Sequence, residues 1–315
     1  MKLETLQLLS LGTQAKTFGA NAQILTVKDG TGWTFDGETH VQAPLDFGDC
    51  TCMIKPLINA LTILDQADVA LNDNHILVSN KESKVKIPLI ADASLSEPSS
   101  EDDYQDMHLD DLLAMRAVSP WCVNETHRPI TNHIMLVNGH AYATDGKSCA
   151  KHAIQYRVAD RVIHSSIINT MSRHEWERIM IGENRIQFRS DDGVTVSCKL
   201  SSEKPLSCEA VFSSWDESNL ISVDCDIKQQ IEKVGHFLTD PSGSFWIDGK
   251  KIMTSKNLED SAYVANIAQD FGSSGFLMSN IKKAFAVADQ IYLTQGAPSM
   301  FKSGNLEIIS MGLRG

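Results

Sequence analysis

The stretch that decides the fold is RIMIGENRIQFRSDDGVTVSCKLS, residues 178–201. Apolar residues occupy alternate positions in three short runs, and turns rich in Gly, Asn, Asp and Ser separate the runs, which predicts three antiparallel strands. The same pattern occurs in DVALNDNHILVSNKESKVKIPLIA from Asp68 and in QIYLTQGAPSMFKSGNLEIISMGL from Gln290. The equivalent apolar residues, spaced by 110 and then 112 positions, are Val69, Ile179 and Ile291. This period is too long for a solenoid repeat and indicates three similar domains.

A short amphipathic helix is predicted before each strand triplet, in IKPLINALTILDQA, HSSIINTMSRHEW and SNIKKAFAVAD. Further upstream, LDDLLAMRAV and DIKQQIEKVGHFL are predicted helices, and HIMLVNGHAYAT is a predicted hairpin with an Asn-Gly turn. Each third therefore reads as an α+β domain with helices packed on antiparallel sheet. The predicted domains span residues 1–97, 107–215 and 219–315, and residues 94–106 have the composition of a linker.

Composition is typical of a soluble globular protein, with 315 residues of which 42% are hydrophobic and 22% charged. No apolar run is long enough for a membrane span, and Glu4 interrupts the apolar start, so neither a span nor a signal peptide is expected. The seven cysteines form no Cys-x-x-Cys pair, which favours reduced thiols in the cytoplasm. The net charge of −12 disfavours nucleic-acid binding through the whole surface, but it allows basic residues confined to one face.

No motif in the sequence demands catalysis. There is no Gly-rich phosphate loop, no dinucleotide fingerprint after a strand and no Gly-x-Ser-x-Gly elbow. The Ser-x-x-Lys match at 201–204 falls in a predicted turn and reads as chance. A hydrolytic enzyme that uses the region of His127, His133 and His140 stays open as an alternative, although no Cys/His spacing completes a zinc site. We expect no catalytic residue, no cofactor and no metal.

Two segments resemble the bacterial sliding clamps, the β subunit of DNA polymerase III. HRPITNHIML…YATDGKSCA, within residues 127–150, is similar to the family's second-domain signature, in which Arg-Pro and an apolar pair precede a strand ending in Ala-Thr-Asp-Gly. The closing IISMGLRG is similar to the family's last strand, in which Met-Pro-Met-Arg is typical. The family's arginine near the end of domain two has no counterpart, because Glu209 and Ala210 stand there. The short chain and these departures fit a divergent bacterial or bacteriophage member.

The resemblance implies a DNA clamp fold with a shallow hydrophobic cleft between domains two and three, where short peptides of a polymerase and a clamp loader dock. Small side chains after the Thr-Asp-Gly turn are expected to keep the cleft open, and the C-terminal strand to offer backbone hydrogen bonds to an extended peptide. The expected cleft residues are Ile130, Thr144, Gly146, Lys147, Ser148, Cys149, Met311, Gly312 and Leu313. Each of these residues also fits a hairpin turn or a core strand without a peptide.

The resemblance also implies a processivity factor, not an enzyme, that encircles duplex DNA as a ring and tethers the replicative polymerase. Three domains close half of a six-part ring, so a head-to-tail homodimer is expected. Sliding needs only a weak, sequence-blind positive potential on the inner helices. The expected DNA-facing residues are Lys16, Lys55, Arg116, Arg173, Lys228, Lys233, Lys282 and Lys283.

Two alternatives remain at this point. The basic residues also fit the solvated faces of ordinary amphipathic helices, and a clamp-fold scaffold that never encircles DNA is the alternative function. In either case we expect a protein of the cytoplasm, associated with the nucleoid of a bacterial or infected bacterial cell.

Overall fold

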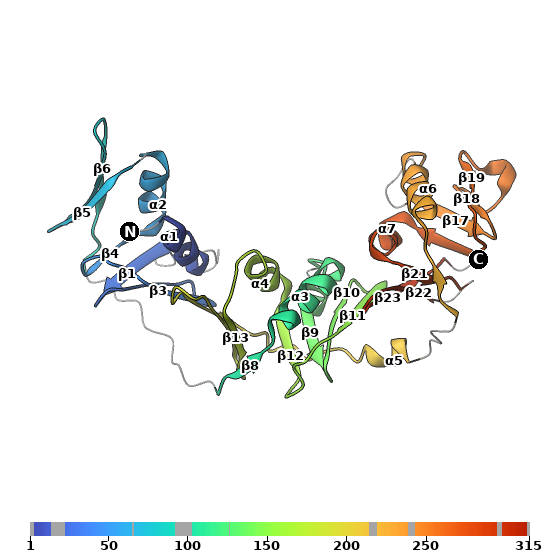
Figure 1. Cartoon of the computed structure of the whole chain (residues 1–315), viewed down its shortest axis with the longest axis horizontal. Helices are drawn as coiled ribbons and strands as arrows, with labels where there is room; N and C mark the ends of the chain where they lie inside the picture. The colour runs from blue at the N-terminus through green and yellow to red at the C-terminus, as the bar shows by residue number, and fades with distance from the viewer. Residues whose placement is uncertain are drawn as a thin grey trace. The chain divides into compact units, whose positions relative to one another are not determined.

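The computed structural model describes residues 3–13, 23–64, 66–91, 103–125, 127–213, 219–238, 243–294 and 298–313 (Figure 1). By packing, the chain divides into two units. Unit 1 comprises Met1–Leu109 and Arg173–Ser201, and unit 2 comprises Asp110–Ser172 and Ser202–Gly315. Each unit contains one eight-stranded antiparallel sheet, one smaller antiparallel sheet and helices. The fold class is therefore α+β, as the sequence predicts.

Unit 1 is built on a sheet with the strand order β4-β1-β2-β3-β15-β14-β13-β8. These strands are β1 (Ile24–Lys28), β2 (Thr31–Phe35), β3 (Thr39–Pro44), β4 (Cys50–Met53), β8 (Gln105–Met107), β13 (Arg178–Ile181), β14 (Arg185–Arg189) and β15 (Thr195–Lys199). The three-stranded sheet consists of β5 (Asp68–Asn72), β6 (His75–Ser79) and β7 (Lys84–Pro88). The helices are α1 (Leu3–Leu9), the 3-10 helix η1 (Ser10–Thr13) and α2 (Ile54–Ile63).

Unit 2 is built on a sheet with the strand order β12-β9-β10-β11-β23-β22-β21-β16. These strands are β9 (His133–Val137), β10 (His140–Thr144), β11 (Ser148–Ala153), β12 (Arg161–His164), β16 (Ile221–Ser222), β21 (Gln290–Tyr292), β22 (Pro298–Ser303) and β23 (Leu306–Met311). The four-stranded sheet consists of β17 (Ser244–Asp248), β18 (Lys251–Met253), β19 (Val264–Asn266) and β20 (Ser273–Leu277).

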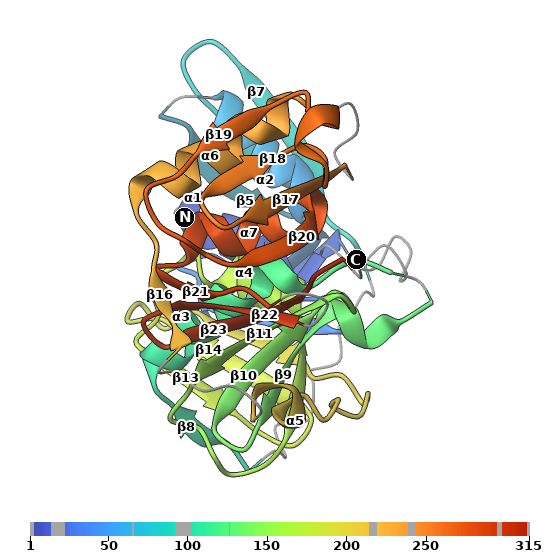
Figure 2. The same ribbon diagram turned by 90° about the vertical axis from the view of Figure 1, so that its right-hand side faces the viewer.

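Most helices of unit 2 lie on one face of its sheets, and α5 lies on the opposite face of the larger sheet (Figure 1). The helices are α3 (Leu109–Val118), α4 (Ser165–Met171), α5 (Glu209–Phe212), α6 (Cys225–His236) and α7 (Met278–Val287), with 3-10 helices η3 (Ser119–Trp121), η4 (Pro129–Asn132) and η6 (Leu258–Asp260). In the larger sheet α4 packs on β12 and η3 on β10 and β11 (Figure 1). In the smaller sheet α6 packs on β18 and α7 on β20 (Figure 2).

All three predicted strand triplets are present, as β5-β6-β7, β13-β14-β15 and β21-β22-β23. Their equivalent residues pair with the next strand as Val69 with Val78, Ile179 with Phe188, and Ile291 with Phe301. Ile179 and Ile291 are fully buried in the eight-stranded sheets, whereas Val69 in the three-stranded sheet is half-buried. The repeat in the sequence is thus a repeat in the fold.

The strands upstream of the triplets repeat as well, in the orders β4-β1-β2-β3, β12-β9-β10-β11 and β20-β17-β18-β19. In each eight-stranded sheet the last strand of a triplet pairs with the last upstream strand of the preceding third, β15 with β3 and β23 with β11. Each large sheet is therefore continuous across a predicted domain boundary. The strands β7 and β19 are left as edges of their own sheets. The division into three domains stays a prediction.

A glycine with positive φ closes the first hairpin of each third. Gly30, Gly139 and Gly249 have φ values of 74°, 76° and 58°. Asp29, before Gly30, and Asn138, before Gly139, also have positive φ, at 50° and 49°. Two successive residues with positive φ define the turn type that matches the twist of a two-residue hairpin. The Asn-Gly and Asp-Gly pairs in the sequence correctly predict these turns.

Several predicted boundaries differ from the structure; the helix predicted from Ile54 to Ala67, for example, ends at Ile63. Residues 105–107, at the end of the linker-like stretch, form the strand β8. They pair with the edge of β13, and Met107 is buried there. The rest of the predicted linker, residues 94–102, lies outside the described residues. The helix predicted up to Trp176 ends at Met171. Trp176 instead packs its ring on Phe188, with ring centres 5.5 Å apart.

Candidate functional site

The Thr-Asp-Gly turn closes the hairpin of β10 and β11 with hydrogen bonds of its own. Oδ1 of Asp145 accepts from the backbone N–H groups of Lys147 at 2.9 Å and Ser148 at 2.6 Å. The Thr144 hydroxyl accepts from the N–H of Gly146 at 3.0 Å and donates to the carbonyl of Ser148 at 2.7 Å. Gly146 has a φ of 81°, which favours glycine. The turn is therefore stabilised by side chains that bind neighbouring backbone groups.

The C-terminal strand joins the turn along β11. The hydroxyl oxygens of Ser148 and Ser310 are buried and lie 2.8 Å apart. The N–H of Met311 donates to the carbonyl of Lys147 at 3.0 Å, and the N–H of Leu313 donates to the carbonyl of Gly275 at 2.7 Å. These two backbone donors at the end of the strand that we expected to bind an extended peptide are engaged within the chain. A docking peptide must displace these bonds or rely on side-chain contacts.

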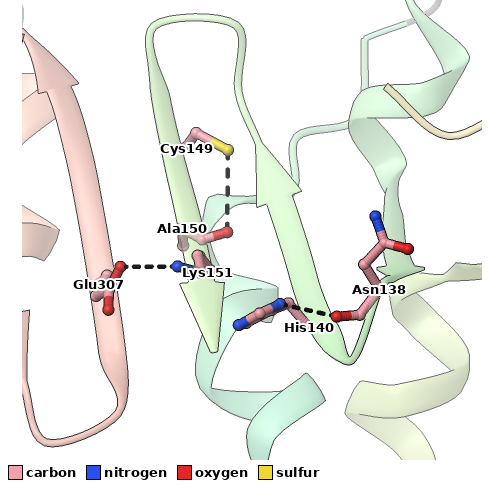
Figure 3. A network of polar contacts seen from close by, with 6 residues as sticks. All are labelled: Asn138, His140, Cys149, Ala150, Lys151 and Glu307. Carbon is pink, nitrogen blue, oxygen red and sulfur yellow. Dashed lines mark hydrogen bonds and ion pairs between the residues drawn. The ribbon is translucent and has the colours of Figure 1, made fainter. Parts of the chain in front are cut away.

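Lys151 lies on the same sheet, two residues after Cys149 (Figure 3). Its Nζ is 3.2 Å from Oε2 of Glu307 on β23 and 5.3 Å from the ring centre of Phe212. Nδ1 of His140 lies 3.2 Å from the carbonyl oxygen of Asn138. Burial and then the charge of Lys151 lower the pKa of His140, so its ring is neutral at neutral pH.

Residues 206–212, which we call the covering segment, lie across this face of the sheet and include α5. One buried apolar cluster contains Met135, Tyr142, Cys149, Val162, Cys208, Phe212 and Ile309. The rings of Phe212 and Tyr142 are centred 6.1 Å apart, and the N–H of Leu206 lies 3.2 Å from the sulfur of Met135. No role was predicted for Leu206, Cys208 or Phe212. The only available signal was the apolar set Leu206, Cys208 and Phe212 in a stretch with no regular period.

The structure divides the nine expected cleft residues into two groups. Thr144, Ser148 and Cys149 are buried, with 8%, 3% and 8% of their surface exposed. Ser148 and Cys149, which were expected to keep a cleft open, are covered, because Ser148 binds Ser310 and Cys149 lies in the cluster with the covering segment; the cleft itself stays a prediction. The exposed or half-buried group comprises Ile130, Gly146, Lys147, Met311, Gly312 and Leu313.

Leu313 also borders a small cavity on the four-stranded sheet. The cavity has a volume of about 130 Å³ and is lined by Trp246, Asp248, Met253, Lys256, Ser273, Ser274, Gly275 and Leu313. A Cβ atom on Gly275 would lie 2.6 Å from Nε1 of Trp246, so glycine is needed for the indole to cross the strand. The C-terminal segment thus contacts the Thr-Asp-Gly turn and also borders the cavity that Trp246 lines.

Unit 1 contains a counterpart of the turn. Oδ1 of Asp36 accepts from the N–H groups of Glu38 at 3.0 Å and Thr39 at 2.7 Å, as Asp145 does in unit 2. The N–H of Lys199 on β15 donates to the carbonyl of Glu38 at 2.9 Å, in the place of the bond from Met311 to Lys147. The turn and its strand junction are therefore general features of the repeat. Only the side chains, such as Glu38 in place of Lys147, distinguish the two junctions.

The histidines of the alternative enzyme reading do not come together as a metal site. Nδ1 of His133 lies 2.8 Å from the carbonyl oxygen of Pro129, and that of His140 lies close to Asn138. Within the described ranges no group of three or more His, Cys, Asp or Glu residues is placed to hold a metal ion. Likewise, no described helix is both long enough and apolar enough to cross a membrane.

Comparison with known proteins finds no matching family model and no matching curated protein. Solved structures do match, each over 99% of this chain and 97% of the other. The DNA polymerase III subunit beta of Pseudomonas aeruginosa has a TM-score of 0.78 at 15% identity. The Helicobacter pylori beta clamp bound to a DNA ligase peptide has a TM-score of 0.79 at 12% identity. A Pseudomonas aeruginosa sliding clamp bound to griselimycin has a TM-score of 0.80 at 16% identity.

The chain has the fold of the bacterial sliding clamps. The clamp fold confirms the resemblance that the Thr-Asp-Gly segment and the closing strand suggest. At identities of 12–16% it establishes the architecture, not the activity.

Most of the expected DNA-facing residues lie on the helices of this clamp fold. Lys55 is on α2, Arg116 on α3, Lys228 and Lys233 on α6, Lys282 and Lys283 on α7, and Arg173 follows α4. Lys228 is half-buried and the other six are exposed, while Lys16 lies outside the described residues. Nζ of Lys283 donates to the carbonyl of Pro120 at 2.8 Å, and Nη1 of Arg116 to that of Ser172 at 3.5 Å. These bonds connect α7 with η3, and α3 with the end of α4.

Proposed function

We propose that the protein is a sliding clamp, a non-catalytic ring that encircles duplex DNA and tethers a replicative polymerase. The observation that carries this proposal is the agreement with bacterial clamps over 99% of the chain, at TM-scores of 0.78 to 0.80. A fold-level match alone does not define a function, so the proposal also draws on edge strands, charge and the site at the C-terminal strand. The protein would act in the cytoplasm, at the nucleoid of a bacterial or infected bacterial cell.

The edge strands support a head-to-tail homodimer. Two of the three possible junctions of the repeat form within the chain, β3 with β15 and β11 with β23. By the same rule the third would join β19 to β7, and both are edges that a second copy could pair. Phe237, which is 51% exposed, stacks on Tyr263 at 4.7 Å, and Val264 on β19 is 40% exposed. Such apolar exposure beside an unpaired edge fits an interface between copies.

Light scattering tests the dimer, with an expected mass near twice 34.7 kDa. Replacing Phe237 with serine should shift the protein toward monomer, while replacing the exposed Leu109 at the start of α3 with serine should not. A monomer at micromolar concentration for the unmodified protein would reject the two-copy ring.

The charge of the helices fits loose retention of DNA better than tight binding. α6 carries Asp226 and Glu232 as well as Lys228 and Lys233, and α7 carries Lys282 and Lys283. A ring needs only a weak positive potential, because enclosure supplies the retention. The whole chain has a net charge of −12, and this acidic excess would repel DNA from the other surfaces.

Enclosure can be tested without knowing the clamp loader. The protein is incubated at high concentration with linear duplex DNA anchored to beads at one end, so that a ring can thread over the free end. That end is then blocked with bound streptavidin, and the beads are washed in high salt. We expect salt-resistant retention only on blocked DNA, and release when a restriction enzyme cuts the duplex. Equal retention on blocked and open DNA would support the scaffold that does not encircle DNA.

Charge reversal tests the helices separately from the rest of the surface. Lys233→Glu combined with Lys282→Glu should reduce retention on blocked DNA. Lys28→Glu combined with Lys81→Glu makes the same change in net charge at exposed positions outside the helices and should leave retention unchanged. Equal losses in the two pairs would contradict a DNA-facing role for α6 and α7.

We further propose that partner peptides dock at the C-terminal junction of unit 2. The accessible part of the site comprises Ile130, Gly146, Lys147, Met311, Gly312 and Leu313. Two structurally similar clamps were solved with a DNA ligase peptide and with griselimycin, which supports peptide binding by analogy, and the sequence resemblance of these segments to the clamp family supports its placement here. Griselimycin is a defined probe: it should bind the chain, and Met311→Ala should weaken binding, while Lys199→Ala at the counterpart junction should not. No binding at all would reject this docking site without affecting the DNA test.

A further inference from the structure

Two thiols meet beneath the covering segment. Cys149 on β11 and Cys208 before α5 belong to the same buried cluster, with 8% and 7% of their surface exposed, and both are free cysteines. A side-chain hydrogen bond joins the two thiols and shifts their pKa values in opposite directions. Cys149 also has a weaker contact, 3.9 Å, with the carbonyl of its neighbour Ala150 (Figure 3). Direct contact between two sulfurs from separate segments is the arrangement that a disulfide requires.

The hydrogen bond makes the two thiols chemically different. As the acceptor, Cys208 has a lowered pKa, because the bond from Cys149 stabilises its thiolate. As the donor, Cys149 has a raised pKa, to which burial adds. Thiolates are the nucleophiles of thiol–disulfide exchange, so Cys208 is the attacking sulfur and Cys149 the resolving one.

The covering segment is suited to opening. Its contacts to the sheet include the rings of Phe212 and Tyr142 and the Cys149–Cys208 pair, and it continues from 201–208, which has no regular secondary structure. When the segment is in place, the hydroxyl of Tyr142 is buried and has no hydrogen-bond partner within the described part of the chain. Burying an unpaired hydroxyl is unfavourable, which lowers the cost of lifting the segment and admitting an oxidant.

We propose that Cys149 and Cys208 form an oxidisable dithiol that, as a disulfide, fastens the covering segment to β11. The oxidant is a low-molecular-weight disulfide such as oxidised glutathione. The Cys208 thiolate attacks one of its sulfurs, forms a mixed disulfide and releases one glutathione thiolate. The Cys149 sulfur, on losing its proton, then attacks the Cys208 sulfur of that mixed disulfide and releases the second glutathione. The protein loses two hydrogens, and one oxidised glutathione becomes two reduced molecules.

The disulfide would act on the docking site of the proposed function, and this consequence rests on that proposal. Cys149 follows the turn whose neighbours Gly146 and Lys147 belong to the accessible site. Fastening residue 208 to residue 149 holds the covering segment closed over the cluster that borders Ile130. The oxidised protein should therefore bind a docking ligand more weakly than the reduced protein.

The first test measures the bond alone. The native full chain is treated with oxidised glutathione, its remaining thiols are alkylated after denaturation, and the digest is analysed by mass spectrometry. We expect one cross-link, joining the peptides that contain Cys149 and Cys208. It should be absent in Cys208→Ala and present in Cys122→Ala, which removes a half-buried thiol outside the cluster. Two alkylated thiols, a stable glutathione adduct on Cys208, or a different partner cysteine would overturn the proposal.

The second test measures the consequence. Amides of residues 206–212 should exchange with deuterium about tenfold more slowly in the oxidised protein than in the reduced protein, because the bond restricts local opening. Unchanged exchange despite a formed bond would show that the disulfide does not fasten the segment. Griselimycin binding to the reduced and oxidised forms separates the two proposals. If the bond forms and slows exchange but neither form binds griselimycin, the docking site fails and the dithiol stands.

Discussion

Removal of the Asp145 carboxylate tests whether the turn is held as the geometry indicates. Asp145→Ala deletes the acceptor of two backbone bonds, at 2.9 and 2.6 Å from Lys147 and Ser148. Bonds to a charged acceptor contribute about 1.5–3 kcal/mol each when buried, and this carboxylate is half-buried, so about 1–1.5 kcal/mol each is reasonable. We therefore expect unit 2 to lose about 2–3 kcal/mol of unfolding free energy, or roughly 5–10 °C in Tm.

Calorimetry gives the Tm, and hydrogen exchange at the Lys147 and Ser148 amides locates the loss. Asp145→Asn keeps a neutral acceptor and should lose about half as much. Asp36→Ala in unit 1 is the comparison: its bonds of 3.0 and 2.7 Å are similar in length, and because Asp36 is buried, at 4% exposure, its loss should be at least as large. A change below about 0.5 kcal/mol for Asp145→Ala, the size of an ordinary surface substitution, would refute the reasoning. So would a large loss from Asp145→Ala with none from Asp36→Ala.

Three further predictions concern stability. Burial, with a smaller effect of Arg185, lowers the pKa of His40 from 6.5 to about 4, so the unfolded chain binds its proton more tightly. The stability this ring confers is complete above pH 6.5 and should fall by up to about 3 kcal/mol toward pH 4; thermal melts of His40→Gln should lack this component. Gly275→Ala forces Trp246 to move and should cost about 1–3 kcal/mol, with a changed near-ultraviolet circular dichroism spectrum. Phe285→Ala empties a core site and should cost about 3–5 kcal/mol in urea titrations.

The parts of the fold that the sequence predicts are those with a local physical cause. The strand triplets follow from alternate burial, as in β14, where Ile186 and Phe188 are fully buried and their neighbours are not. The hairpins follow from glycines that tolerate positive φ, such as Gly139. Helix α3 has the predicted bounds, Leu109–Val118, because its apolar residues Leu112, Met115 and Val118 recur at helical spacing.

The parts that escape prediction depend on pairings between distant segments. No local signal says that β11 pairs with β23, where Ser148 and Ser310 stand 162 residues apart and bury each other. Without that pairing, the sequence leaves open whether Ser148 and Cys149 line the cleft that the family resemblance implies or belong to a core strand. The position of the covering segment could not be predicted for the same reason, since Cys208 packs against Cys149 of a segment distant in sequence.

The repeated junction also bears on which residues carry specificity. Asp36 and Asp145 make the same bonds, so the Asp-Gly turn positions a strand in both units and selects no partner. In the last third the corresponding connection, from β18 to β19, is a longer loop containing η6, and among the described residues no strand pairs with β19 on its other side. In the proposed homodimer, a second copy would supply β7 at that edge. The same junction, used twice within the chain and once between copies, would then close the ring. Loss of the β19 edge should therefore abolish DNA retention while leaving both eight-stranded sheets folded.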